Sequence, residues 1–216
     1  MIRHATMWNQ KAGRSQDVLT IFQKARAIHE RHGIRVSAFL NVTGDLAYLR
    51  TSYLMDFDSF SDQARGLMAM NQDPDWTALW ARALGADAPV SPGGSTFVIF
   101  PDPDNPQPPG PWDPIISTLQ QFRVEPGRGE EAMVLLKEIR ERRLANGAGH
   151  IRIGRLGYGP NAGGMTMVIE HESWEAWGKA NDAIGPEMRE FMRKSFGPDA
   201  PARMIDNVVR WRMQLT

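Results

Sequence analysis

The sequence predicts an α+β protein built from two tandem repeats, each with the element order β-α-β-β-α-β. Two observations support this prediction. The stretch 166–174 (TMVIEHESW) repeats 52–60 (SYLMDFDSF): a strand-like run is followed by acid, ring, acid, serine and ring. The same spacing aligns Gly127 with Gly13 and Gly147 with Gly33. Repetition of this kind indicates that one supersecondary unit has been duplicated.

A proline-rich stretch separates the two copies. Seven of the fourteen residues at 101–114 are proline, which is excluded from helix interiors and from central strands. We therefore expect a first repeat at 1–101, a stiff linker at 102–114 and a second repeat at 115–216.

The first repeat begins with an alternating strand at 2–8. The helix expected at 17–32 has an apolar stripe and stops at Gly33, and its stripe consists of Val18, Ile21, Phe22, Ala25 and Ile28. A Thr-Gly-Asp turn separates the next two strands. The remaining elements are strands at 35–42 and 46–57, helical segments at 59–70 and 76–84, and a short strand at 95–100.

The second repeat follows the same plan, with a Gly-rich hairpin at 157–164 between its two middle strands. Its predicted strands lie at 116–124, 150–156, 165–172 and 204–213, and its helices at 130–146, 173–183 and 186–196. The split connectivity places both helical segments of a repeat on one face of its sheet. We expect the other face to carry Trp8, Phe122, Met167 and Ile169, so that the two sheets pack face to face as a barrel-like sandwich.

The composition of the chain argues against nucleic-acid binding and membrane association. Formal net charge is zero, so no long-range field attracts nucleic acid or an anionic membrane. No apolar run reaches membrane-spanning length, no signal peptide is visible, and cysteine is absent, which together suit the cytoplasm. Seven tryptophans and twelve methionines either fill the core or line an adaptable pocket for a flat apolar ligand.

Several short motifs resemble the dimeric α/β-barrel superfamily, with the nearest similarity to NIPSNAP-like domains and with both subunits fused in one chain. The motifs are the strand and Pro-Gly turn at 122–127, the strand end at 170–173, and Asp73-Pro74-Asp75-Trp76. The second repeat departs from the last motif at 185–188. The resemblance implies ferredoxin-like repeats and a small-molecule site. The superfamily includes cofactor-free oxygenases and cyclases of aromatic polyketides as well as haem-binding proteins.

Three residues are candidates for catalysis. His171 ends a central strand, and its counterpart in the first repeat is the apolar ring Phe57. It is either a general base or a core histidine bonded to the backbone. Tyr53 is a candidate donor to a substrate oxygen, and Gln120 a polar group on a buried strand; each can equally be a core residue.

Four further residues are candidates for substrate binding: His4, Trp8, Arg155 and Met167. His4 and Trp8 share one face of the first strand. Arg155 would hold a carboxylate or phenolate if it reached a pocket, and otherwise lies on a solvated edge strand. Because His171 has no histidine counterpart in the first repeat, we expect a single functional pocket, in the second repeat.

No cofactor or metal is expected. His29 and His32 are placed at a solvent-facing helix end, and no second ligand pair supports a metal there. Haem remains an alternative, with His171, His150 or His4 as axial ligand. Gly157-x-Gly159 lies in a hairpin rather than before a helix, so it is not a dinucleotide fingerprint.

These observations predict a small-molecule enzyme, a cofactor-independent oxygenase, cyclase or isomerase acting on an aromatic or polyketide-like molecule. The alternative is a non-catalytic protein that binds haem or a hydrophobic metabolite. In either case the protein would bind a small hydrophobic or aromatic molecule. A homo-oligomer is compatible with the fold.

Overall fold

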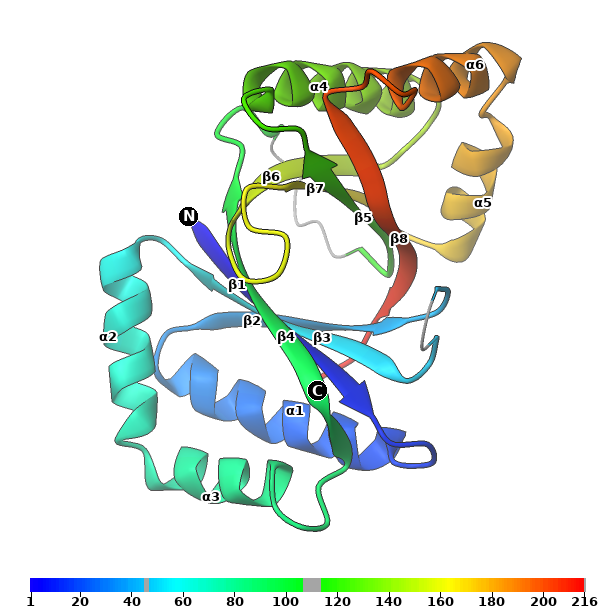
Figure 1. Cartoon of the computed structure of the whole chain (residues 1–216). Helices are drawn as coiled ribbons and strands as arrows, with labels where there is room; N and C mark the ends of the chain where they lie inside the picture. Colours follow the sequence, from blue (N-terminus) through cyan, green and yellow to red (C-terminus); the bar gives the residue numbers. More distant parts are fainter. Residues whose placement is uncertain (45–46, 107–113, 216) are drawn as a thin grey trace. The chain divides into compact units, whose positions relative to one another are not determined.

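The computed structural model describes residues 1–44, 47–106 and 114–215, with 92–94 described as backbone alone. The chain divides into two compact units. Unit 1 comprises Met1–Phe100, Tyr158–Pro160 and Arg212–Thr216, and unit 2 comprises Pro101–Gly157 and Asn161–Trp211. Figure 1 shows the elements of both units.

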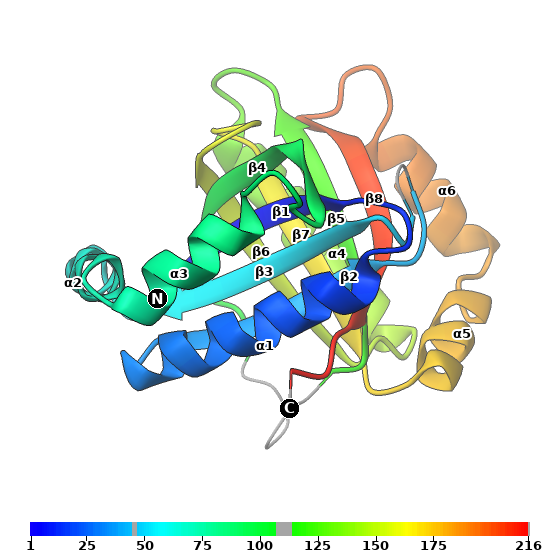
Figure 2. The ribbon, with the colours of Figure 1, turned by 90° about the horizontal axis from the view of Figure 1, so that it is seen from below.

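Unit 1 has four strands in the order β2-β3-β1-β4, with antiparallel pairing of β1 to β3, β1 to β4 and β2 to β3. Figures 1 and 2 show α1, α2 and α3 on one side of these strands. The elements are β1 (Ile2–Gln10), α1 (Ser15–Arg31), β2 (Arg35–Asn41), β3 (Arg50–Phe57), α2 (Phe60–Asn71), α3 (Pro74–Ala83) and β4 (Val90–Pro101).

Unit 2 repeats this topology, with strand order β8-β5-β7-β6 and antiparallel pairing of β5 to β7, β5 to β8 and β6 to β7. The elements are β5 (Ile116–Val124), α4 (Gly129–Ala145), β6 (His150–Tyr158), β7 (Met165–His171), α5 (Trp174–Asp182), α6 (Pro186–Ser195) and β8 (Ala202–Arg212). The predicted α+β fold class is confirmed, and the second helical segment of each repeat is a pair of helices.

Local chemistry explains the shared helix starts. Ser59 and Ser173 occupy equivalent N-cap positions, and each hydroxyl accepts a hydrogen bond from the backbone N–H three residues on. Asp73 caps α3 in the same way through Asp75 N–H, with Pro74 at the first helical position. Gly33 and Gly147 follow α1 and α4 with positive φ, as helix ends favour.

The strand face assignment differs from the prediction. Phe122, Met165, Met167 and Ile169 form one buried cluster with residues of α4 and with Met188 of α6, and Trp8 packs into the corresponding cluster of unit 1. These side chains therefore face the helices of their own unit. Alternation along a strand separates two faces but does not say which one the helices cover.

Three boundaries also differ. The described part of the third predicted strand, 46–57, is strand only from Arg50, and β4 begins at Val90 rather than at 95. The start of the predicted linker is held to unit 2, and 107–113 lie outside the described residues. Over the part of the chain that the structure describes, no helix is long and apolar enough to cross a membrane.

Candidate functional site

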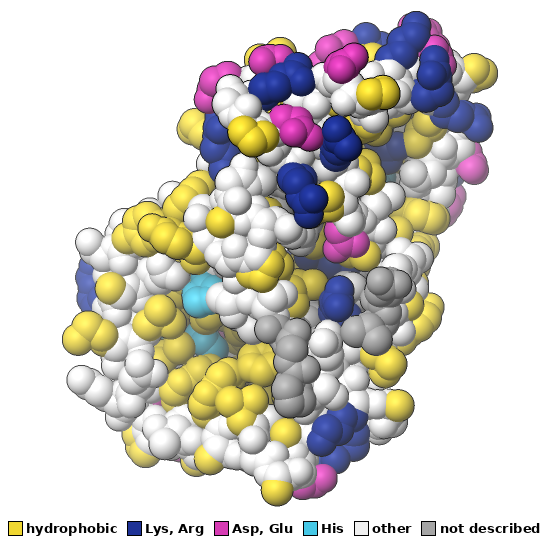
Figure 3. Space-filling model, viewed as in Figure 1, with side chains coloured by type: hydrophobic (Ala, Val, Ile, Leu, Met, Phe, Trp, Pro, Cys, Tyr) yellow, Lys and Arg dark blue, Asp and Glu magenta, His cyan; other side chains and the backbone are white. Residues whose placement is uncertain are grey.

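A cavity of about 840 Å³ lies within unit 1, between β1, β3 and β4 and the three helices. Its volume falls in the range of ligand sites. Figure 3 shows hydrophobic and histidine side chains around a hollow over these elements. The polar and aromatic lining residues are His4, Thr6, Trp8, Lys11, Phe22, His29, Tyr53, Asn71, Trp76, Trp80, Ser91 and Thr96.

A row of hydroxyl groups crosses the sheet beneath the cavity. Thr6 of β1 is paired with Thr96 of β4 on one side and with Tyr53 of β3 on the other. Directly paired residues of antiparallel strands share a face, so the three side chains point to the helix side together. Ala38, the partner of Tyr53 on β2, is fully buried and contributes only a methyl group.

Tyr53 is in contact with His29 of α1. The phenol oxygen lies 3.2 Å from His29 Nδ1, which also lies 2.5 Å from the carbonyl oxygen of Ala25. A carbonyl can only accept, so Nδ1 carries the proton and donates it. The phenol oxygen is then a second acceptor for that N–H, which leaves the Tyr53 O–H available to a ligand. His29 Nε2 is unprotonated, buried and without a hydrogen-bond partner among the described residues.

Burial controls the protonation of this pair. Desolvation lowers the pKa of His29 to about 4, with the Ala25 carbonyl opposing the shift and His32 adding to it. Burial also raises the pKa of the Tyr53 phenol well above its usual range. Near pH 7 the site therefore holds a neutral imidazole, whose Nε2 lone pair is bound by no described residue, beside a neutral phenol donor.

Three tryptophans form an aromatic wall. Trp76 and Trp80 of α3 stack with ring centroids 5.3 Å apart, and Trp8 meets Trp80 edge-on at 5.4 Å. Trp76 also packs edge-on against His29, at 5.0 Å. Aromatic faces in offset stacks and edge contacts provide a flat surface suited to an aromatic ligand.

The wall is positioned by the start of α3. The Asp73 carboxylate accepts from Asp75 N–H at 2.9 Å, from Arg31 at 2.6 Å and lies 2.9 Å from His32 Nε2. The hydrogen bonds from His32 and Arg31 lower the pKa of Asp73 to about 2. Side chains at the end of α1 thus hold the helix that carries Trp76.

His4 gives the cavity a second polar group. It is paired with Met55 on β3, two residues from Tyr53, so the two side chains are diagonal neighbours on one face. The Gln63 amide nitrogen lies 3.3 Å from His4 Nδ1, and as a donor it leaves the ring proton on Nε2. Burial lowers the pKa of His4, which favours the neutral ring.

Of the residues predicted from sequence, the cavity brings together Tyr53, His4 and Trp8. Met167 and Gln120 lie in unit 2, where Met167 is fully buried in the core cluster and Gln120 donates to Asn207 at 3.4 Å. Neither lines the unit 1 cavity.

His171 is also in unit 2 and is 1% exposed. Neither of its ring nitrogens has a hydrogen-bond partner among the described residues. Burial, followed by the charge of Arg143, lowers its pKa to about 4. The backbone contact expected of a core histidine is therefore not found for its ring.

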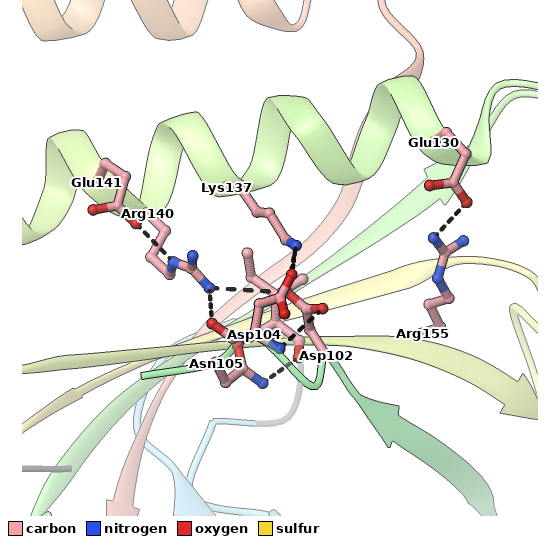
Figure 4. A network of polar contacts seen from close by, with 9 residues as sticks. Asp102, Asp104, Asn105, Glu130, Lys137, Arg140, Glu141 and Arg155 are labelled. Carbon is pink, nitrogen blue, oxygen red and sulfur yellow. Dashed lines mark hydrogen bonds and ion pairs between the residues drawn. The ribbon is translucent and has the colours of Figure 1, made fainter. Parts of the chain in front are cut away.

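Arg155 is not among the residues that line the cavity; it lies on β6 of unit 2 and binds Glu130 of α4 at 2.9 Å (Figure 4). Beside it, α4 and β6 hold the segment after β4. Lys137 binds Asp104 at 2.6 Å, and the Asn105 side chain donates to the Ile153 carbonyl and accepts from Ile153 N–H, both at 2.8 Å. This network ties the start of the predicted linker to unit 2.

The cavity lies in the first repeat, whereas the sequence predicted a pocket in the second. Larger or differently shaped side chains occupy the equivalent positions of unit 2. Ala25 is replaced by Ile139, which is 1% exposed. Trp8 is replaced by Phe122, which stacks on Phe196 with centroids 5.5 Å apart. Both side chains are thus packed into the core of unit 2.

Sequence reasoning missed His29, which was expected at a solvent-facing helix end and is 1% exposed. The spacing of residues along α1 predicts that His29 is buried. Val18, Phe22, Ala25 and His29 follow one another at spacings of four, three and four residues, so they share one face of α1. His32 does lie at the helix end and is bound to Asp73.

No protein-family model matches the chain, and no curated protein matches it. Solved structures do. A provisionally assigned monooxygenase of Lactobacillus acidophilus has a TM-score of 0.62 at 11% identity, over 100% of this chain and 94% of the other. A provisionally assigned monooxygenase of Fusobacterium nucleatum has 0.61 at 10% identity, over 100% and 92%. An anthrone oxidase-like protein has 0.60 at 10% identity, over 99% and 91%.

These likenesses establish the fold, and it is the α+β fold expected from the sequence. A NIPSNAP domain protein of Burkholderia xenovorans matches half of the chain, at 18% identity and a TM-score of 0.43.

Proposed function

We propose that the protein is a cofactor-independent oxygenase that binds a flat aromatic ketone or phenol in the unit 1 cavity. One observation carries the proposal: the Tyr53–His29 pair, a donor beside an open lone pair, in a cavity of about 840 Å³ walled by tryptophan. The names of the fold relatives, two provisional monooxygenases and an anthrone oxidase-like protein, support the same reaction class.

The proposed first step is removal of a proton from a methylene group that is conjugated to a ketone through an aromatic ring, as in anthrone. Tyr53 O–H donates to the ketone oxygen, on which negative charge develops. His29 Nε2, which has no hydrogen-bond partner among the described residues, accepts the proton. A pKa of about 4 keeps this nitrogen unprotonated at neutral pH, and the nascent enolate stabilises the imidazolium that forms.

Molecular oxygen is the co-reactant of the second step. The enolate transfers an electron to O₂, and the two radicals combine into a carbon-bound peroxide. The peroxide takes the proton back from His29, and the hydroperoxide loses water to leave a new carbonyl group. One oxygen atom thus stays in the product and the other leaves as water, so a methylene group is oxidised by four electrons.

Oxygen uptake with anthrone tests this proposal. We expect uptake above the buffer rate, with one O₂ consumed per quinone formed. The rate should fall at least tenfold in Tyr53→Phe and His29→Leu and stay unchanged in Tyr158→Phe, whose ring is exposed. Equal rates for the wild-type protein, the two cavity variants and buffer would overturn it.

A second candidate is haem binding, because His29 also has the arrangement of an axial ligand. Its Nδ1–H is held by the Ala25 carbonyl while Nε2 is open, the orientation that metal-bound histidines adopt. Titration with haemin distinguishes the candidates. A sharp Soret band that disappears in His29→Leu but persists in His4→Gln would favour haem, and an unshifted haemin spectrum would reject it.

A further inference from the structure

The charged side chain that lines the unit 1 cavity is basic. Among the described residues, no aspartate or glutamate lines it, whereas Lys11 does. His4 and His29 are both neutral, because burial lowers the pKa of each. A ligand in the cavity therefore meets one permanent charge, and that charge is positive.

Lys11 stands at the exposed end of the cavity. Its backbone is anchored there, since its N–H donates to the Pro89 carbonyl at 2.8 Å and its carbonyl accepts from Arg14 N–H at 3.1 Å. Asn71 and Leu84, which also line the cavity, are exposed as well. The Lys11 main chain is thus fixed, and its exposed side chain is part of the cavity lining.

The ammonium group is not neutralised within the protein. In the described part of the chain Lys11 makes no ion pair, and the nearby Asp87 carboxylate is bound by Arg14 at 2.9 Å. The Arg14 hydrogen bond is also the main cause of the lowered pKa of Asp87, with Lys11 contributing a weaker charge effect. An incoming anion would therefore not have to displace an existing partner of Lys11.

Lys11 and Tyr53 are separated along the strand. Tyr53 is level with Thr6 on β1, and Lys11 is five residues further on, about 16 Å at ~3.3 Å per residue. The aromatic wall, including Trp8, lies over this interval. The cavity thus has a hydrogen-bond donor at one end, a cation at the other and a flat apolar surface between them.

We propose that the natural ligand is an aromatic acid: a fused-ring body whose carbonyl or phenol meets Tyr53 and whose carboxylate meets Lys11. This inference rests on the proposed function and adds the charge of the substrate to it. Amines are disfavoured, because the cavity offers them no carboxylate and places Lys11 at the entrance.

Paired probes test the inference: anthraquinone-2-carboxylate and neutral 2-methylanthraquinone, each titrated into the full-length protein and followed by tryptophan fluorescence. We expect the carboxylate to bind about 3- to 5-fold more tightly, the size of a partly exposed ion pair. Lys11→Gln should remove this preference and Lys11→Glu should reverse it. Lys24→Gln, at an exposed lysine of α1 outside the cavity, should leave it unchanged.

The outcomes separate the two proposals. Raising the salt to 0.5 M should shrink the preference, because the ion pair is exposed to solvent. If both probes bind the wild-type protein equally, or if Lys11→Gln keeps the preference, the carboxylate assignment is overturned while the cavity remains a ligand site. If neither probe binds, the proposed function itself fails.

Discussion

The phenol oxygen of Tyr53 lies 3.2 Å from Nδ1 of His29, and both side chains line the same cavity. The pair belongs to the first repeat alone. The equivalent positions of the second repeat hold Met167 and Arg143, and Met167 is fully buried in the core. Duplication thus left one repeat free to keep or acquire a polar pair where the other has a packed core.

Tyr53→Phe should weaken binding of 2-methylanthraquinone about fivefold, because one neutral hydrogen bond contributes about 1 kcal/mol. The ring remains, and His29 keeps its bond to Ala25, so we expect little change in the free energy of unfolding. Fluorescence titration and urea unfolding measure both quantities. Tyr158→Phe is the control, and unchanged affinity in Tyr53→Phe would exclude the phenol as a ligand donor.

Ala25→Ile should close the cavity. The second repeat already has isoleucine at this position, Ile139, where it is packed and buried. We expect the affinity for either anthraquinone probe to fall at least tenfold, while the melting temperature stays the same or rises because the void is filled. Ala81→Ile, at an exposed position of α3, controls for the isoleucine itself. Full affinity in Ala25→Ile would place the ligand elsewhere.

His171 should make the protein sensitive to acid. Its pKa is about 4 in the folded chain and 6.5 in the unfolded chain, so between these values the unfolded chain binds more protons. The free energy of unfolding therefore decreases as pH falls through this window, by about 3 kcal/mol for this group.

His171→Phe, which introduces the residue of the first repeat, should remove that part of the pH dependence. We expect the variant to gain about 2 kcal/mol relative to wild type between pH 7.5 and pH 5. Urea unfolding at the two pH values checks this. An identical pH dependence in both proteins would mean that His171 does not titrate in this range.

Gly159→Ala should be strongly destabilising. Gly159 has φ +97°, and a Cβ there would lie 2.1 Å from the carbonyl oxygen of Thr96. Gly163 also has a positive φ, but no atom lies within 4 Å of the position of a Cβ there. Gly163→Ala therefore measures the backbone strain alone, which we expect to lower the free energy of unfolding by about 1–2 kcal/mol. We expect Gly159→Ala to cost about 1–3 kcal/mol more in urea unfolding. Equal losses would show that the hairpin moves away freely.

Much of the fold could be predicted because its signals are local. The serine caps Ser59 and Ser173 and the glycines after α1 and α4 each act within a few residues, and the structure contains all of them. Strand ends without such signals were misplaced, as at β4, where pairing to β1 extends the strand to Val90.

The candidate site was only partly predictable. Tyr53, His4 and Trp8 were identified as polar or aromatic groups on buried strands, which strand alternation is able to show. His171 was preferred over His29 because it interrupts an apolar face. The lone pair of His29 becomes visible only once the Ala25 carbonyl and the Tyr53 phenol are in place around its ring.

By itself the sequence determined that this protein is a duplicated α+β unit, because caps, turns and hydrophobic periods are properties of neighbouring residues. Tertiary structure alone decided which face of each sheet the helices cover and that the first repeat encloses a cavity. A cavity is the small volume left where side chains from several distant elements fail to meet. Its presence therefore depends on their joint packing, as Ala25 and Ile139 show at equivalent positions.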